Sequence, residues 1–415
     1  REAGEHSMSY GVALRNGVPF TLGTIAALCV NATTQWNPLS LWPDGIDSPG
    51  MWMSPRTLTS EWQDYTGTTP VVTPGTVADL SNPVGLALDI RAGDPPPLGP
   101  ELVVNGDFSN GTTDWSITGG NWSVVGGAMQ HTPGASSFFQ QTRAVLPLGA
   151  NKWFELQYTV SGRTAGDFTL YFGGSSANGY SGNGTHTIRF CDTGGSYGLL
   201  FDAGSAYDGA IDNISIKEIP GNHMLQSTSA ARPLMSAYDG QTLGPGDTYD
   251  ATGYPIFQKY DGVDDGMATA AFSAGTLING MDCMIAVRRD AGTVGIVGLS
   301  DVASAGYFFG FFHEPNNTEP NFGSVGTPTT WCDGVQLAGG TATTRATLYN
   351  ALTAGDWHIV EWRGLDLSGF TAAVFSAMTS GAFRLNGARG DIFLYPSTAS
   401  TEDKDAARQY LADYY

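Results

Sequence analysis

Acidic side chains are the first residues of this sequence that could carry chemistry. Asp264 and Asp265 are neighbours, and successive residues of a strand point to opposite faces. Hydrolysis of a glycosidic bond needs two carboxyl groups about 5 to 10 Å apart, one on each side of the bond. We therefore expect Asp264 and Asp265 to form a turn or to bind calcium rather than to act as an acid–base pair.

Common catalytic motifs are also absent from the sequence. The sequence has no H-E-x-x-H zinc helix, no Walker phosphate-binding loop and no G-x-G-x-x-G dinucleotide fingerprint. Catalysis requires groups with tuned protonation that are held close together, and no such set is apparent. We therefore expect that the protein is not an enzyme.

Aromatic side chains in loops form the second group of candidates. A sugar ring has an apolar face and a hydroxylated rim, so proteins bind it with an exposed aromatic ring beside amides and carboxylates. Tyr180 and Tyr207 lie in segments rich in Gly and Ser, which favour loops. We predict that these two tyrosines, together with Trp122 and Trp331, bind carbohydrate. The alternative for each is an ordinary position in the hydrophobic core.

The composition excludes two classes of partner. The 415 residues carry a formal net charge of -20 and no basic cluster, so we expect no binding to nucleic acid. The longest apolar stretch, 17–30, is too short and too interrupted to cross a bilayer, so we expect no membrane insertion. Only 14% of residues are charged and 56 are Gly, which is typical of many short strands joined by tight turns.

The four cysteines, Cys29, Cys191, Cys283 and Cys332, are far apart in the sequence. They form no C-x-x-C pair, and no histidine follows them at zinc-finger spacing. We therefore expect free buried thiols rather than a framework of disulfides. Calcium, which binds oxygen ligands, is the one metal that we expect this acidic chain to take.

Shifts in composition divide the chain into four regions. Residues 1–50 have no regular period and are expected to form an arm that packs on a partner or on the protein itself. Residues 51–100 contain short strands and end in the proline-rich linker 94–100, which favours an extended spacer. Residues 101–219 and 220–415 contain runs of alternating apolar and polar residues, which predict strands.

Residues 51–89 resemble a small module of bacteriophage virion proteins. The similar residues are Trp52, the runs Glu61-Trp62-Gln63-Asp64 and Gly67-Thr68-Thr69-Pro70-Val71, and Pro83-Val84-Gly85-Leu86 before Asp89. Met53-Ser54-Pro55 departs from the Asp-Pro-Ser of that module. The resemblance implies a virion protein whose arm, 1–50, is anchored to other virion proteins.

Residues 101–219 resemble a carbohydrate-binding jelly roll of the galactose-binding-like type. The similarity rests on Asn105-Gly106-Asp107-Phe108 near the start and Ile211-Asp212-Asn213-Ile214 near the end. In that family an acid after the Phe and an Asp of the last strand often bind calcium, which implies a Ca²⁺ site at Asp107 and Asp212. Ser109 replaces the usual Glu and removes one ligand. The alternative is that Asp107 forms a turn and Asp212 is a solvated strand residue.

Residues 220–415 resemble a concanavalin A-like, or laminin G-like, lectin sandwich. The similar segments are 260–265, 278–287, 357–362 and 391–395, in that order. Glycosidases with this sandwich carry two glutamates around an aspartate on one strand, whereas 357–362 contains only Glu361. A final helix, with Ser400 or Thr401 as its N-cap, is common in phage forms of this sandwich. Arg389-Gly390-Asp391 spells an adhesion tripeptide, which we interpret as a chance match.

The expected fold class is therefore all-β. Two antiparallel β-sandwiches, a jelly roll and then a concanavalin A-like domain, stand in tandem behind an irregular N-terminal region and before a short C-terminal helix. The resemblances imply a phage virion protein, a tail fibre or receptor-binding protein, that contacts host-surface glycans without catalysis and assembles as a homo-trimer. The alternatives are a capsid decoration or head fibre protein with purely structural sandwiches, and a secreted glycan hydrolase.

Overall fold

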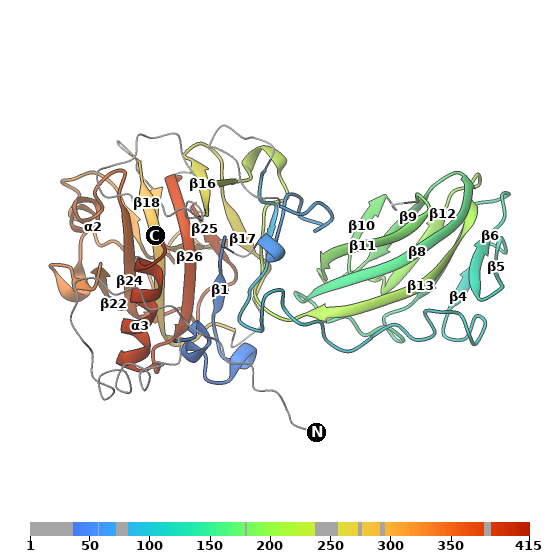
Figure 1. Ribbon diagram of the computed structural model, residues 1–415, viewed down its shortest axis with the longest axis horizontal. Coiled ribbons are helices and arrows are strands. Elements are labelled where there is room, and N and C mark those ends of the chain that lie inside the picture. The colour runs from blue at the N-terminus through green and yellow to red at the C-terminus, as the bar shows by residue number, and fades with distance from the viewer. Residues whose placement is uncertain are drawn as a thin grey trace, which may run out of the picture.

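The computed structural model describes residues 36–56, 58–71, 82–178, 181–236, 256–272, 276–290, 295–376 and 383–415. Strands dominate these residues, and they form two antiparallel sandwiches that lie side by side (Figure 1). A short helix follows the last strand. The predicted all-β class of two sandwiches with a C-terminal helix is therefore confirmed. Most of the predicted arm, 1–35, lies outside the described residues.

The first sandwich is the jelly roll predicted for 101–219, and it consists of two five-stranded antiparallel sheets. One sheet has the order β11-β8-β13-β6-β5 and the other has the order β10-β9-β12-β7-β4. The strands are β4 (Ser116–Thr118), β5 (Trp122–Val125), β6 (Ala128–His131), β7 (Ser137–Gln141), β8 (Trp153–Ala165), β9 (Phe168–Phe172), β10 (Ser175–Asn178), β11 (Gly184–Cys191), β12 (Leu199–Ala203) and β13 (Asp208–Ile219).

Alternation along the strands builds the core of this sandwich. In β9, Phe168, Leu170 and Phe172 are buried while the residues between them are not, as a period of two requires. Phe139 of β7 stacks on Phe201 of β12, with ring centroids 4.8 Å apart. Burial of these large side chains removes the greater part of their apolar surface from water and holds the two sheets together.

The second sandwich contains a larger pair of sheets. One has the order β15-β16-β26-β18-β24-β22-β23, and the facing six-stranded sheet has the order β2-β3-β14-β17-β25-β20. The strands from the C-terminal part of the chain are β14 (Met224–Leu225), β15 (Leu234–Ser236), β16 (Phe257–Asp261), β17 (Met267–Thr269), β18 (Asn279–Arg289), β19 (Gly295–Ile296), β20 (Leu299–Asp301), β21 (Phe311–Phe312), β22 (Gly326–Cys332), β23 (Val335–Gln336), β24 (Trp357–Asp366), β25 (Ala373–Phe375) and β26 (Asn386–Pro396). β19 pairs only with β21 among the described strands.

Residues 51–100 were predicted to form a separate module, but their strands belong to the second sandwich. β1 (Met51–Met53) pairs with β26, while β2 (Glu61–Trp62) and β3 (Leu86–Ala87) complete the six-stranded sheet. β3 also pairs with β14, so the jelly roll is inserted between two adjacent strands of the second sandwich. Strands of two or three residues bury too little surface to fold alone, which explains why this segment joins the larger sheets.

The C-terminal helix packs against one face of β26. Helix α3 (Thr401–Ala412) begins at Ser400, whose Oγ accepts the amide hydrogen of Asp403 at 3.0 Å, as predicted for its N-cap. The other helical segments are α2 (Arg345–Ala351), η1 (Pro38–Leu41), η2 (Gly45–Asp47), η3 (Leu58–Ser60), η4 (Ser229–Ala231) and η5 (Gly340–Ala342). Among the described residues, no helix has the length and apolar character needed to span a membrane.

The described part of the arm packs on the protein itself. Trp42, which follows η1, is buried between Trp52 and Phe393, and its indole N–H donates to the carbonyl of Leu394 at 3.0 Å. Trp36 donates to Asp403 of α3 at 3.0 Å. Residues 36–50 therefore pack on the second sandwich.

A threonine-rich loop joins the two sandwiches. The carboxylate of Asp64 accepts the backbone N–H groups of Thr66, Thr68 and Thr69, which closes the loop after β2. Burial of this carboxylate would raise its pKa, but these hydrogen bonds outweigh burial and lower the pKa of Asp64. The carbonyl of Thr66 then accepts the N–H of Arg189 in β11 at 2.7 Å. Residues 64–69 thus contribute to the contact between the sandwiches.

Candidate functional site

Two of the predicted sugar-binding aromatics are core residues, which corrects the prediction. Tyr207 has no exposed surface, and Trp122 is only 4% exposed. The ring of Trp122 packs against Phe139 at 4.7 Å, and its N–H donates to the carbonyl of Ser137. The Gly-rich sequence around Tyr207 does form a turn, but the side chain turns inward, where it fills the space between the sheets.

Of the other two predicted aromatics, the structure describes Trp331. Trp331 in β22 is half-buried, and the guanidinium of Arg363 lies 4.2 Å from its ring centroid. This cation–π contact covers one face of the ring that a sugar would use. Tyr180 lies outside the described residues.

Asp107 and Asp212, the predicted calcium ligands, lie at one end of the jelly roll. Asp107 accepts the N–H and the hydroxyl of Ser109, at 3.1 and 2.9 Å, which is the turn that the alternative prediction named. Burial, and then the charge of Asp107, raise the pKa of Asp212, so the two carboxylates are close enough to interact.

The loop beside Asp107 is closed by protein groups. The side-chain amide of Asn105 donates to the carbonyls of Gly111 and Thr113 at 3.0 and 2.9 Å. A cation in this loop would compete for the same carbonyl oxygens. The residues present therefore fit a turn that is closed by its own hydrogen bonds better than they fit a calcium site.

The acidic residues considered for catalysis are engaged elsewhere. Glu361 is completely buried, and its carboxylate forms ion pairs with Arg363 and Arg408. Asp265 accepts the N–H of Asp261 at 2.9 Å, and Asp261 accepts the N–H of Val263, so these acids hold a bend after β16. Burial and the charge of Asp261 raise the pKa of Asp265 to about 7.

The adhesion tripeptide is inaccessible. Arg389 and Asp391 in β26 have no exposed surface. The carboxylate of Asp391 forms an ion pair with Arg56 and accepts hydrogen bonds from Trp52 and Tyr415. This burial supports the interpretation of the tripeptide as a chance match.

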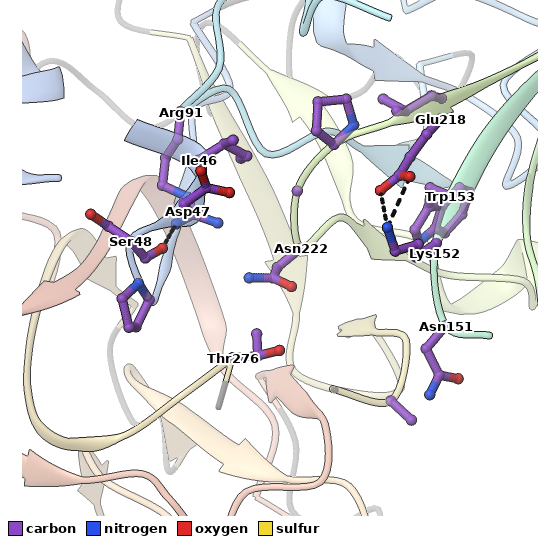
Figure 2. A pocket seen from close by; sticks show the side chains of 15 residues that line it. Ile46, Asp47, Ser48, Arg91, Asn151, Lys152, Trp153, Glu218, Asn222 and Thr276 are labelled. Atoms are coloured by element: carbon purple, nitrogen blue, oxygen red, sulfur yellow. Dashed lines mark hydrogen bonds and ion pairs between the residues drawn. The ribbon is translucent and has the colours of Figure 1, made fainter. Parts of the chain in front are cut away.

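A polar cleft of about 370 Å³ lies where the two sandwiches meet. Residues 46–49 and Arg91 line one side, and residues 151–153 and 218–219 of the jelly roll line the other (Figure 2). The connector 220–222 forms its back wall, and Ala271 and Thr276 complete the lining. The cleft exists because the jelly roll enters and leaves the second sandwich through adjacent strands.

Several polar side chains of the cleft have donor or acceptor atoms that form no hydrogen bond with the described residues. Asp47 and Asn151 are exposed, and the described residues provide no hydrogen bond to either side chain. The side-chain N–H of Asn222 donates to the carbonyl of Gly50 at 2.7 Å, and its side-chain oxygen accepts no hydrogen bond from the described residues. Figure 2 shows Asn222 between the Asp47 side and the Lys152 side of the cleft.

Charged groups on the walls are fixed in position. Lys152, directly before β8, donates to both carboxylate oxygens of Glu218 in β13, at 2.8 and 2.9 Å. Arg91 forms a two-point ion pair with the buried carboxylate of Asp89. The side chain of Arg91 is therefore a rigid wall of the cleft rather than a free cation.

An aromatic residue forms part of the cleft floor. Trp153 begins β8 and is only 2% exposed, and its ring lies edge-on to His223 at 5.7 Å. Its indole N–H has no acceptor among the described residues. A buried donor without a partner is costly, so a ligand or a water with an acceptor oxygen would be stabilised there.

Sequence reasoning missed this cleft for a physical reason. Its residues come from six separated stretches, 46–49, 91, 151–153, 218–222, 271 and 276, and each stretch taken alone shows no signal of a site. Only the pairing of β3 with β14 brings residues 46–49 and 151–153 to the same place.

Comparisons with known proteins give no family for this chain. No protein-family model matches it, and no curated protein matches it. Among solved structures, the N-terminal CBM22-1-CBM22-2 tandem domain from Paenibacillus barcinonensis Xyn10C is 13% identical, with 74% of this chain and 94% of that chain covered and a TM-score of 0.27. An anti-sigma factor domain-containing protein is 9% identical, with 60% and 84% covered and a TM-score of 0.12. At such TM-scores function must be argued from the residues.

Proposed function

We propose that this chain is a non-catalytic adhesion protein that binds glycans in the cleft between its two sandwiches. The observation that carries the proposal is the presence in one cleft of free amide and carboxylate groups from both sandwiches. Asp47, Asn151 and Asn222 offer acceptors and donors to sugar hydroxyls, which is the kind of polar pattern that orients a small ligand in a preformed cleft.

Binding without bond cleavage is the more consistent chemistry for these residues. Asp47 and Glu218 are the two acids that line the cleft. Glu218 is held in an ion pair with Lys152, so Asp47 is the one lining acid without an ion pair among the described residues, whereas glycoside hydrolysis requires two cooperating carboxyl groups. Glu361, the acid of the strand that glycosidases use, is enclosed by two arginines.

A place on a phage particle is the cellular context that we propose. The resemblance of residues 51–89 to a virion module supports this context, with residues 1–50 linking the chain to other virion proteins. Many copies on one particle would let sites with dissociation constants on the order of 1 mM hold a cell, since linked sites bind at high effective concentration. Tail fibre or receptor-binding protein is the role that this adhesion fits.

Assembly as a homo-trimer is part of the same proposal. Sedimentation of the full chain at micromolar concentration measures it directly. A single species of three times the monomer mass of 43.7 kDa is expected. A monomer under these conditions would contradict trimer formation, and it would leave glycan binding by each chain to be judged separately.

A glycan array probed with the full chain tests the central part of the proposal. Binding to a defined set of bacterial surface saccharides is expected, and chromatography of the same saccharides after prolonged incubation should detect no shorter products. Shorter products would show that the chain is a hydrolase. Absence of binding to every saccharide would exclude glycan adhesion.

A purely structural role is the second candidate, and one observation favours it. Trp122 and Tyr207, the two described jelly-roll aromatics that were expected to contact sugar, are core residues and offer a sugar no ring face. In that case the sandwiches act as spacers or as capsid decoration. A silent array together with binding of the chain to purified capsids would support this candidate.

A further inference from the structure

Three metal-ligating side chains meet in the second sandwich, outside the cleft. Cys332 is the last residue of β22, Asp333 follows it in the turn to β23, and His358 lies in β24. A sulfur, a carboxylate oxygen and an imidazole nitrogen from these residues all lie within 4.8 Å of one another. No function proposed above uses them.

The pairing of β22 with β24 creates this cluster. Cys332 is opposite Val360, and the N–H of Asp333 donates to the carbonyl of Ile359 at 2.9 Å. In return, the N–H of Ile359 donates to Oδ1 of Asp333 at 2.8 Å. This pair of hydrogen bonds fixes the carboxylate and directs Oδ2 to Nδ1 of His358, 2.8 Å away.

The distances are close to those around a tetrahedral metal. Sγ of Cys332 lies 3.8 Å from Nδ1 of His358 and 3.6 Å from Oδ2 of Asp333. With zinc bonds of about 2.3 Å to sulfur and about 2.0 Å to nitrogen and oxygen, tetrahedral angles place ligand atoms roughly 3.3 to 3.6 Å apart. Each atom would need to move by only about half an ångström to bind one ion.

The geometry does not suit nucleophilic catalysis. In a catalytic triad the nucleophile and the acid contact opposite nitrogens of the imidazole, so that one nitrogen takes the proton of the nucleophile while the acid orients the ring through the other. Here Cys332 and Asp333 both face Nδ1 of His358. Convergence of three donors on one point is what chelation requires.

We propose that Cys332, Asp333 and His358 form a binding site for a borderline-soft divalent transition metal, with Zn²⁺ as the natural occupant. Thiolate, imidazole and carboxylate are the ligands that zinc takes in proteins. On binding, the thiol of Cys332 loses its proton to solvent, and the thiolate and the carboxylate together neutralise the ion. Asp333 is exposed, so solvent can supply a fourth ligand.

The hydrogen bonding of His358 determines the affinity for zinc that we expect. Nε2 of His358 is buried and has no acceptor among the described residues. Zinc-binding histidines usually donate from this second nitrogen, and loss of that contact lowers affinity by roughly 10 to 100-fold. We therefore expect a dissociation constant in the micromolar range rather than the far tighter binding of structural zinc sites.

Cobalt provides the test, because a thiolate bound to Co²⁺ gives a charge-transfer band that aqueous Co²⁺ lacks. The full, reduced chain is titrated with Co²⁺, and Zn²⁺ is then added to displace it. One equivalent of Co²⁺ should produce the band, and Zn²⁺ should abolish it. The band should be lost in C332S and in H358Q. It should persist in C191S, which removes the partly exposed thiol of the jelly roll.

Each other outcome counts against the site. Absence of the band in the reduced wild-type chain at 1 mM Co²⁺ would overturn the proposal without recourse to any variant. A band that persists in C332S, or that disappears in C191S, would place the binding at another thiol. Circular dichroism of each variant reports whether it is folded, and D333N, which retains the carbonyl oxygen for Ile359, should weaken binding at least tenfold.

Discussion

The guanidinium of Arg56 lies 2.9 Å from the carboxylate of Asp391, and this ion pair joins the N-terminal edge of the described chain to its last strand. Asp391 has no exposed surface and also accepts from the indole of Trp52 and the hydroxyl of Tyr415. The second sandwich is thus closed by residues from both ends of the sequence, with the jelly roll inserted between them.

Removal of this carboxylate should destabilise the second sandwich strongly. In D391A, the charge of Arg56 remains buried without its partner, so we expect the free energy of unfolding to fall by about 3 to 5 kcal/mol. Chemical denaturation measures this change. E218Q is the control: it breaks the exposed pair with Lys152 and should cost about 1 kcal/mol or less. Equal effects of the two variants would contradict the structural role of Asp391.

The contact between the sandwiches should depend on Arg189. Its guanidinium lies 4.1 Å from the ring centroid of Trp62, donates to the carbonyl of Gly67 and pairs with Glu155. We expect R189A to leave both sandwiches folded but to loosen their contact, which small-angle scattering would detect as a larger radius of gyration. R163A, which breaks an ion pair elsewhere on the jelly roll, should leave the radius unchanged. An unchanged radius in R189A would mean that other contacts fix the arrangement.

Stability near neutral pH should reflect two buried groups that act in opposite directions. His223 accepts the N–H of Asp89 at Nδ1 and faces the carbonyl of Ile219 with Nε2, so it is held neutral. Burial lowers the pKa of His223 to about 4, so its contribution is complete above its unfolded pKa of 6.5 and is lost as pH falls toward 4. Asp265, whose pKa is raised to about 7, contributes stability that is lost as pH rises.

Variants separate these two effects. Between pH 7 and pH 5, protonation linked to His223 should cost about 2 kcal/mol of unfolding free energy, and Asp265 should restore a similar amount, so the wild-type chain should change little. D265N should therefore lose stability on acidification. H223Q should instead gain stability. Denaturant titrations at both pH values test this, and identical pH dependence in the three proteins would refute the assignment.

Calcium should have little effect on the jelly roll. Because the amide of Asn105 already satisfies the carbonyls of Gly111 and Thr113, we expect the melting temperature to be the same in excess Ca²⁺ and in chelator. A rise in melting temperature with Ca²⁺ that D212N abolishes would instead establish the predicted site at Asp107 and Asp212.

The strands could be predicted from the sequence, but their partners could not. Alternation in 153–160 and 211–216 marked β8 and β13, because a half-buried strand imposes a period of two. Resemblance to the lectin sandwich marked 357–362, which is part of β24. The same alternation cannot show that β3 pairs with β14, or that residues 51–89 belong to the second sandwich. Such long-range pairing depends on which surfaces fit, which no local pattern contains.

Whether a site residue could be predicted also depended on whether its role is set by neighbouring residues or by distant ones. A loop-like sequence around Tyr207 predicted a turn but could not show that the ring points inward. Cys332 and His358 are 26 positions apart and meet only through strand register, so spacing rules for zinc did not detect them. Ser400 was predicted as an N-cap because capping depends on neighbouring residues alone.

Glycan binding by cleft variants is the measurement that tests the account most directly. D47A/N151A removes two exposed side chains that make no hydrogen bonds to the described residues, and D356A/N350A alters two exposed residues of the second sandwich away from the cleft. On the same saccharide array, the account predicts that the wild type and D356A/N350A bind alike and that D47A/N151A loses at least tenfold in signal. Undiminished binding by D47A/N151A would contradict the account.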